Sequence, residues 1–187
     1  MRVGPILFLA VVSLANGGSG PITAAQASAM CGEVPIPAPV SRLLRAKFSQ
    51  WRPERVSDLD GDDRRSWSDE HQKDCPGIAV GHFESTGKLS YAVVLVPISG
   101  AHSGYRIVVF SESPTADAYK WLLLEQKYGK DQFAPAISKG APGKYLGLDR
   151  SKSVLLKLDG INVEWIEKSF VLYYWRGGHY RRLWTSD

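Results

Sequence analysis

The sequence predicts a mainly β (α+β) fold: an antiparallel sheet meander, of propeller-like or sandwich form, with one N-terminal helix. Short runs rich in β-branched and aromatic residues recur from residue 77 onward, as they do in strands. Two of the turns between such runs carry the glycine signals of tight hairpins. Helical spacing of apolar residues is clearest in one early segment, residues 40–51.

The N-terminus has the pattern of a secretory signal peptide. Arg2 is the only charged residue before Glu33, an apolar stretch covers residues 6–15, and Ala-Ser-Ala stands at 27–29. These are the basic, apolar and cleavage regions of such a signal. We expect residues 1–29 to be removed, leaving a single β-rich domain at 30–187 that is periplasmic or secreted from a bacterium. An uncleaved anchor is the alternative, but so short an apolar stretch does not span a bilayer. No transmembrane segment is expected in the mature chain.

The mature chain holds two cysteines, Cys31 and Cys75. In an oxidising compartment an even number of cysteines indicates a disulfide. Closing a loop of this length stabilises a fold by about 4 kcal/mol in the chain-entropy description. The alternative, a reactive thiol, needs a neighbouring base or helix N-terminus, and no known signature of that kind surrounds Cys75. We therefore predict the disulfide.

Residues 40–51 are predicted to form the helix, and Pro53 ends it. The strands that follow are predicted at 78–83, 91–96, 105–110 and 120–124. A helix over 115–127 is the alternative for the last of these, because its alanines and leucines also favour helix. Residues 127–152, rich in glycine, lysine and serine, are expected to cross the surface.

Residues 54–76 are polar and are expected to form a loop or irregular region. Within it, Asp58, Asp60 and Asp62 are weak candidates for metal ligands, since oxygen ligands at alternate positions fit the start of an EF-hand loop. The glycine of this segment comes too early and no glutamate closes the pattern. A solvated acidic loop is therefore the preferred interpretation, and no metal or cofactor is expected.

One hairpin is predicted at Asp159-Gly160. This dipeptide separates residues 154–158 from 161–165, and it is a strong signal for a two-residue turn. Such a turn would place Leu158 opposite Ile161 and leave one face of the hairpin apolar.

A second hairpin is predicted at Gly177-Gly178, joining residues 170–175 to 179–184. Its register would pair Trp175 with Tyr180, Tyr173 with Arg182, and Val171 with Trp184. One face is then aromatic with an arginine within it, an arrangement suited to cation–π packing.

Residues 76–95 read PGIAVGHFESTGKLSYAVVL, with glycines and apolar residues at Gly81, Phe83, Gly87, Tyr91 and Ala92. This segment resembles a unit of the FG-GAP or VCBS type, and the resemblance implies a β-hairpin of a propeller-like or related sheet. The stretch from Ile161 to Asp187 is also similar to the ending of small exported bacterial proteins of uncharacterised function that carry such a unit.

In the FG-GAP family, carboxylates of the hairpin loop bind calcium. The corresponding positions here are His82, Glu84, Thr86 and Ser90. Calcium needs six to eight oxygen ligands, so the resemblance does not carry a metal site into this chain. We expect the loop to be ordered by hydrogen bonds, with Gly87 at a positive φ.

Composition and motifs exclude several classes of function. The net charge of +4 falls by one when Arg2 is removed, which is too mild and too dispersed for nucleic acid. The four histidines show no metal-ligand spacing. Residues 100–104 place a serine one position away from that of a nucleophile elbow. No enzymatic activity is predicted.

The loop at 99–105 is a candidate for partner binding through Ser99, Gly100, His102, Ser103 and Tyr105. It is similar in composition to the Ser-Gly-x-x-Tyr loop that periplasmic lysozyme inhibitors insert into their enzyme, although its tyrosine is differently spaced. A flexible glycine-rich turn is the alternative. The predicted function is an exported, non-enzymatic binding protein that acts through a rigid β scaffold on an unknown protein or cell-envelope component. The alternative is a periplasmic inhibitor or immunity protein against a lysozyme-like cell-wall hydrolase.

Overall fold

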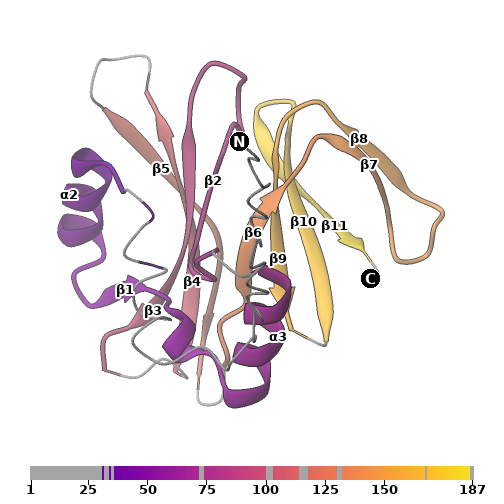
Figure 1. Ribbon diagram of the computed structural model, residues 1–187. Coiled ribbons are helices and arrows are strands. Elements are labelled where there is room, and N and C mark those ends of the chain that lie inside the picture. Colours follow the sequence, from indigo (N-terminus) through magenta and orange to yellow (C-terminus); the bar gives the residue numbers. More distant parts are fainter. Residues whose placement is uncertain are drawn as a thin grey trace, which may run out of the picture.

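Two antiparallel sheets pack face to face, with a helix on one outer face and a hairpin on the other (Figure 1). This computed structural model describes residues 31, 34, 36–71, 74–99, 103–113, 118–129, 132–166 and 168–185. The predicted signal peptide lies outside the described residues. The mainly β (α+β) class is confirmed, and of the forms considered the structure has the sandwich.

The first sheet contains the strands predicted in the middle of the chain. Its members are β1 (Trp51–Pro53), β2 (Ile78–Gly81), β3 (Ser90–Pro97), β4 (Gly104–Glu112) and β5 (Tyr119–Tyr128). β1 and β2 pair with successive parts of one edge of β3, and β4 and β5 follow on its other side. The helical alternative for 115–127 is wrong, because β5 pairs with β4 along its whole length.

The second sheet has the order β11-β10-β9-β6. Its strands are β6 (Ala136–Gly140), β9 (Gly160–Trp165), β10 (Ser169–Arg176) and β11 (His179–Thr185). The hairpin at Gly177-Gly178 is confirmed together with all three predicted residue pairs. Both glycines have positive φ values, 63° and 84°, as a type I′ turn requires.

The hairpin predicted at Asp159-Gly160 is wrong. Residues Ser153–Leu156 (β8) pair with Gly143–Leu146 (β7), while β9 lies between β6 and β10. The chain turns a corner at Gly160, where an added Cβ would lie 2.6 Å from Cδ1 of Leu172. The apolar side of β8 is thereby placed on the outer face of the second sheet, against Leu172. β6 and β7 also show that residues 127–152 are not merely a surface segment.

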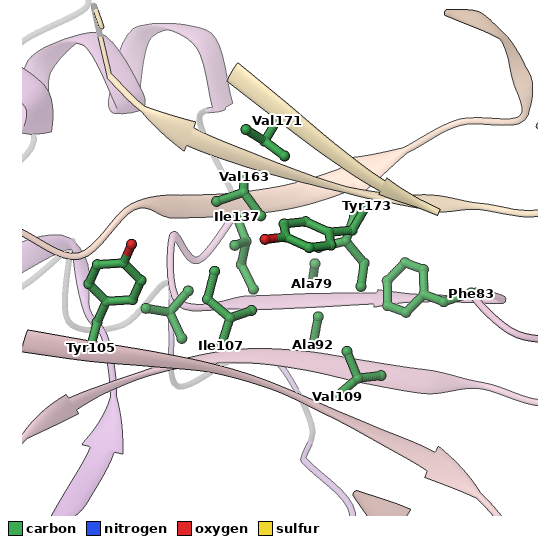
Figure 2. Packing of buried hydrophobic residues seen from close by; sticks show 12 residues of the cluster. Ala79, Phe83, Ala92, Tyr105, Ile107, Val109, Ile137, Val163, Val171 and Tyr173 are labelled. Carbon is green, nitrogen blue, oxygen red and sulfur yellow. The ribbon is translucent and has the colours of Figure 1, made fainter. Parts of the chain in front are cut away.

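The main core lies between the two sheets, where their side chains interdigitate (Figure 2). Phe83 and Tyr105 stand at opposite ends of this layer, and both are almost fully buried. Alternation along each strand sends the intervening residues to the outer faces. The buried residues of this core are Ala79, Phe83, Ala92, Val94, Tyr105, Ile107, Val109, Ile137, Ile161, Val163, Val171 and Tyr173.

Helix α2 (Ala38–Lys47) covers the outer face of the first sheet (Figure 1). The helix predicted over 40–51 is thus confirmed in place, but it ends at Lys47, and its last predicted residue begins β1. Phe48, just after the helix, meets Phe110 and Trp121 edge to face. The Cys31–Cys75 disulfide is confirmed and joins this layer to the start of β2.

A helix that the sequence did not predict, α3 (Gly61–His71), follows the 3-10 turn η1 (Val56–Asp58). Asp60 accepts hydrogen bonds from the N–H groups of Asp62 and Asp63, as an N-cap does. Trp67 is the buried residue of α3, and through it the helix packs against the rest of the fold. The prediction of an irregular region over 54–76 is therefore wrong in this part. No described helix combines the length and apolarity needed to cross a membrane.

Candidate ligand cleft at the open edge of the sandwich

The two long edges of the sandwich are built differently. At one edge the sheets meet through the main chain: the N–H of Ile137 on β6 donates to the carbonyl of Pro76, just before β2, over 2.7 Å. At the other edge stand β5 and β11, each the last strand of its sheet. A cavity of about 320 Å³ opens there between the inner faces of the two sheets. We call it the Glu125 cleft.

Glu125 lies at the centre of this cleft and is held by two tyrosines. The hydroxyl of Tyr105, on β4 of the same sheet, donates to Oε1 over 2.7 Å. The hydroxyl of Tyr173, on β10 of the opposite sheet, donates to Oε2 over 2.7 Å. Both oxygens of one carboxylate are therefore fixed, and hydrogen bonds to an ionised acceptor are among the stronger ones in proteins.

The two tyrosine hydroxyls keep their protons at neutral pH, because their pKa values are raised. Burial raises the pKa of the Tyr105 hydroxyl, and its hydrogen bond to Glu125 raises it further. The pKa of Tyr173 is raised by the same two causes, and the guanidinium of Arg182 acts in the opposite direction. The arrangement is thus two neutral phenols bonded to one carboxylate.

The aromatic wall of the cleft is formed by two indole rings. Trp165 on β9 and Trp184 on β11 are nearly parallel, with ring centroids 6.3 Å apart. Tyr105 meets Trp165 edge to face at 6.4 Å. Trp184 is 46% exposed, so part of this apolar surface faces solvent at the cleft.

Cations and neutral polar groups complete the lining. Arg182 projects from β11 on the face of Tyr173, because the two residues are paired across the hairpin. Lys127 extends from the end of β5, and Lys168 follows β9. The remaining polar groups of the lining are Gln132 and Ser169.

A second carboxylate cluster ties the sheets together farther along the same edge. Oε1 of Glu84 accepts from Ser111 Oγ over 2.7 Å and from the hydroxyl of Tyr180 over 3.3 Å. Its Oε2 pairs with Lys120 Nζ at 2.7 Å. The ammonium of Lys120 also lies 5.5 Å from the ring centroid of Trp175. Glu84 and Glu125 thus bond two different tyrosines of the second sheet.

Another buried carboxyl, Glu54, lies outside the cleft beside the disulfide. It is 2% exposed, and none of the described residues donates to its Oε2. Burial raises the pKa of this carboxyl well above its ordinary value of 4.5, and the charge of Asp58 raises it further. The protonated form is therefore favoured in the folded protein.

The three weak metal candidates are occupied by other interactions. Both oxygens of Asp58 accept from the guanidinium of Arg52, at 2.5 and 2.7 Å. Asp60 caps α3, and Asp62 forms an ion pair with Arg65. No group of three or more potential metal ligands occurs among the described residues.

The loop predicted at 99–105 is described only in part, since Gly100 and His102 lie outside the described residues. Ser99 and Ser103 are exposed. Tyr105 is 2% exposed and belongs to β4, where its hydroxyl reaches into the Glu125 cleft. Partner binding through this loop stays a prediction.

The hairpin implied for residues 76–95 is present as β2 and β3. Its loop is held by hydrogen bonds: the N–H of His82 donates to Asp159 over 2.8 Å, and Glu84 bonds as described above. The expected positive φ at Gly87 is wrong, because the positive values among the described glycines fall elsewhere. The loop therefore turns without a left-handed residue at that position.

Sequence reasoning did not identify Glu125 as a site residue. Its partners are 20 and 48 residues away in the chain, and no local motif links them. The available signal was the predicted pairing of Tyr173 with Arg182, which placed a tyrosine and an arginine on one face. No family model, curated protein or solved structure matches this chain.

Proposed function

We propose that the protein is an exported, non-enzymatic binding protein that holds a small ligand of the cell envelope in the Glu125 cleft. The observation that carries this proposal is the fixed carboxylate: two tyrosines from opposite sheets hold both oxygens of Glu125 at the open edge. The aromatic wall of Trp165 and Trp184 stands beside it. Ligand sites commonly combine apolar aromatic surface with a few polar groups in fixed positions.

The scaffold supports a binding role because it holds these groups without needing a ligand. Most of the side chains that surround the cleft project from paired strands, and Tyr105 and Tyr173 also belong to the buried core. Their positions are therefore set by packing, so that little conformational freedom is left to lose on binding. The disulfide supports export, since such bonds persist mainly in oxidising compartments.

The chemistry of the cleft favours binding over hydrolysis. Glycoside hydrolysis usually takes two carboxyl groups, one as acid and one as base or nucleophile. Among the described residues that line the cleft, Glu125 is the single carboxylate, and both its oxygens already accept hydrogen bonds. This supports a role as a positioned acceptor.

The proposal is tested by sedimentation of the mature, disulfide-bonded protein with the isolated envelope fraction of the cells that make it. We expect wild type to pellet with that fraction and Glu125→Gln to pellet markedly less. Glu112→Gln is the matched control, because this carboxylate of β4 also accepts from a tyrosine, Tyr119. Its neighbour Ser111 faces the inside of the sandwich, so Glu112 faces the other side. Melting curves of both variants establish that they are folded.

Two results would overturn the proposal. In the first, wild type stays in the supernatant at every protein concentration. In the second, the two glutamate variants sediment equally. Turnover of an envelope component by wild type but not by Glu125→Gln would replace a binding role with a catalytic one.

A further inference from the structure

The centre of the Glu125 cleft presents acceptors. Tyr105 and Tyr173 both direct their hydroxyl hydrogens to the carboxylate. The oxygen of Tyr173 also accepts from Arg182, and that of Tyr105 accepts from Trp165, so the lone pairs still open to a ligand are mainly those of Glu125. A ligand that reaches the centre therefore has to supply hydrogens, as sugar hydroxyls or amide N–H groups do.

The rim of the cleft presents positive charge. Among the described lining residues the cations are Lys127, Lys168 and Arg182, against the single carboxylate of Glu125. The balance favours an anionic ligand. A guanidinium offers a planar fork of donors that matches a carboxylate in two parallel hydrogen bonds. The exposed Arg182 already lines the cleft, where it hydrogen-bonds to Tyr173 and keeps further donors for a ligand.

The aromatic wall presents flat apolar surface beside these charges. Trp184 stacks on Trp165 with 20° between the ring planes, and it is 46% exposed, so its indole presents apolar surface at the cleft. A sugar ring has C–H groups on its faces and hydroxyls around its perimeter. It can therefore cover an indole face while its hydroxyls reach polar groups at the side.

We propose that the Glu125 cleft binds a short acidic carbohydrate, a sugar ring that carries a carboxylate. This inference rests on the proposed function and names the ligand class of that same site. The sugar hydroxyls donate to Glu125, the ring lies on the exposed part of Trp184, and its carboxylate meets Arg182. A volume of about 320 Å³ lies at the lower end of the range for small-molecule sites, ~300–1,000 Å³.

A phosphorylated ligand fits these groups less well. Phosphates are usually held by main-chain N–H groups at helix N-termini or in glycine-rich nests. The described lining comes from the two sheets and their connections, and it includes no residue of a helix N-terminus. A nucleotide stacked on the tryptophans would also bring a doubly charged phosphate close to Glu125.

The experiment compares an acidic sugar with its uncharged ester, and both with a nucleotide. Digalacturonate, its dimethyl ester and uridine monophosphate are titrated into the mature protein, and binding is followed by tryptophan fluorescence and calorimetry. We expect saturable binding of digalacturonate that weakens by about tenfold or more for the ester, since tenfold corresponds to the loss of about one charged hydrogen bond. Added salt should weaken the binding of the acid and leave the binding of the ester unchanged.

Two neighbouring arginines provide the matched variants. Arg182 pairs with Tyr173, which faces the core, whereas Arg181 pairs with Tyr174 on the other face of β10 and β11. We expect Arg182→Ala to weaken the binding of digalacturonate by about tenfold or more, and Arg181→Ala to leave that affinity unchanged. Both variants lose the same charge, so an equal effect would show non-specific attraction and overturn the proposal.

The remaining outcomes separate this inference from the proposed function. Equal affinity for acid and ester, or preference for uridine monophosphate, would overturn the acidic carbohydrate and leave a binding cleft. Failure to bind any of the three, while sedimentation with the envelope still depends on Glu125, would also overturn only the ligand class. If none of the three ligands binds and sedimentation with the envelope is the same for wild type and Glu125→Gln, both the ligand class and the proposed function are overturned.

Discussion

The hydroxyl of Tyr173 on β10 donates to Oε2 of Glu125 on β5 over 2.7 Å, across the gap between the two sheets. The main-chain contact between Ile137 and Pro76 holds the opposite edge. This bond therefore helps to set the separation of the sheets where the cleft opens. It also removes a buried hydroxyl from water without leaving it unpaired, which is a condition for burying such a group at little cost.

Removal of this hydroxyl should weaken the fold. We expect Tyr173→Phe to lower the free energy of unfolding by about 1–3 kcal/mol, because a carboxylate oxygen loses its donor. Tyr174→Phe is the control, since Tyr174 is next along β10 and its ring packs on the outer face. Urea unfolding at neutral pH measures both. Equal stability of the two variants would contradict a structural role for the bond.

The disulfide should contribute to stability. We expect the double variant Cys31→Ser, Cys75→Ser to unfold with about 4 kcal/mol less free energy in the chain-entropy description. This corresponds to a fall in Tm of roughly 10 °C for a chain of this size. Reductant should lower the wild-type Tm to that of the double variant and leave the variant unchanged. A variant as stable as oxidised wild type would rule out the effect.

Glu54 should make stability depend on pH. Its pKa is raised in the folded state by burial, so its contribution is fully present below the unfolded value of 4.5 and is lost as pH rises through the folded pKa. We expect Glu54→Gln, which does not titrate, to gain in Tm relative to wild type as the pH rises above 4.5 toward the folded pKa. A difference in Tm between the two proteins that stays constant above pH 4.5 would contradict the prediction.

Gly77 should tolerate no side chain. An added Cβ would lie 2.3 Å from the carbonyl oxygen of Glu54, a main-chain atom of a residue whose N–H is bonded to Val94. We expect Gly77→Ala to cost about 3 kcal/mol of stability, as severe overpacking does. Gly87→Ala is the control, because its Cβ would meet nothing within 4 Å. Thermal unfolding followed by circular dichroism compares the two, and a Gly77 variant as stable as the control would refute the close packing.

The two hairpin predictions show where local sequence decides and where it does not. At Gly177-Gly178 the two flanking strands, β10 and β11, pair directly with each other, and no other strand lies between them. The turn signal therefore sets their register. At Asp159-Gly160 both edges of β9 are taken by strands from elsewhere in the chain, β6 and β10. There the pairing with distant strands outweighs the local preference for a hairpin. The sequence near Asp159-Gly160 does not show which distant strands will pair with β9.

The candidate site was hidden from sequence reasoning by an irregularity in β5. Simple alternation from Lys120, which faces Glu84 on the inside, would turn Glu125 toward α2. The register instead shifts between Ile107 and Val108, so that Leu123 and Glu125 oppose consecutive residues of β4. This bulge returns Glu125 to the inner face. Its position depends on the pairing with β4, which the pattern of β5 alone does not reveal.

Side chains rather than main chain bridge the β5–β11 edge at Glu84 and Glu125, and this has a consequence for how such a protein can diversify. The reach of one carboxylate sets how close the sheets come at each end. Replacing Glu125 with aspartate would shorten that reach by one methylene and narrow the opening. Single substitutions at this edge can thus change the width of the opening, while the disulfide, the helices and the shared core stay as they are.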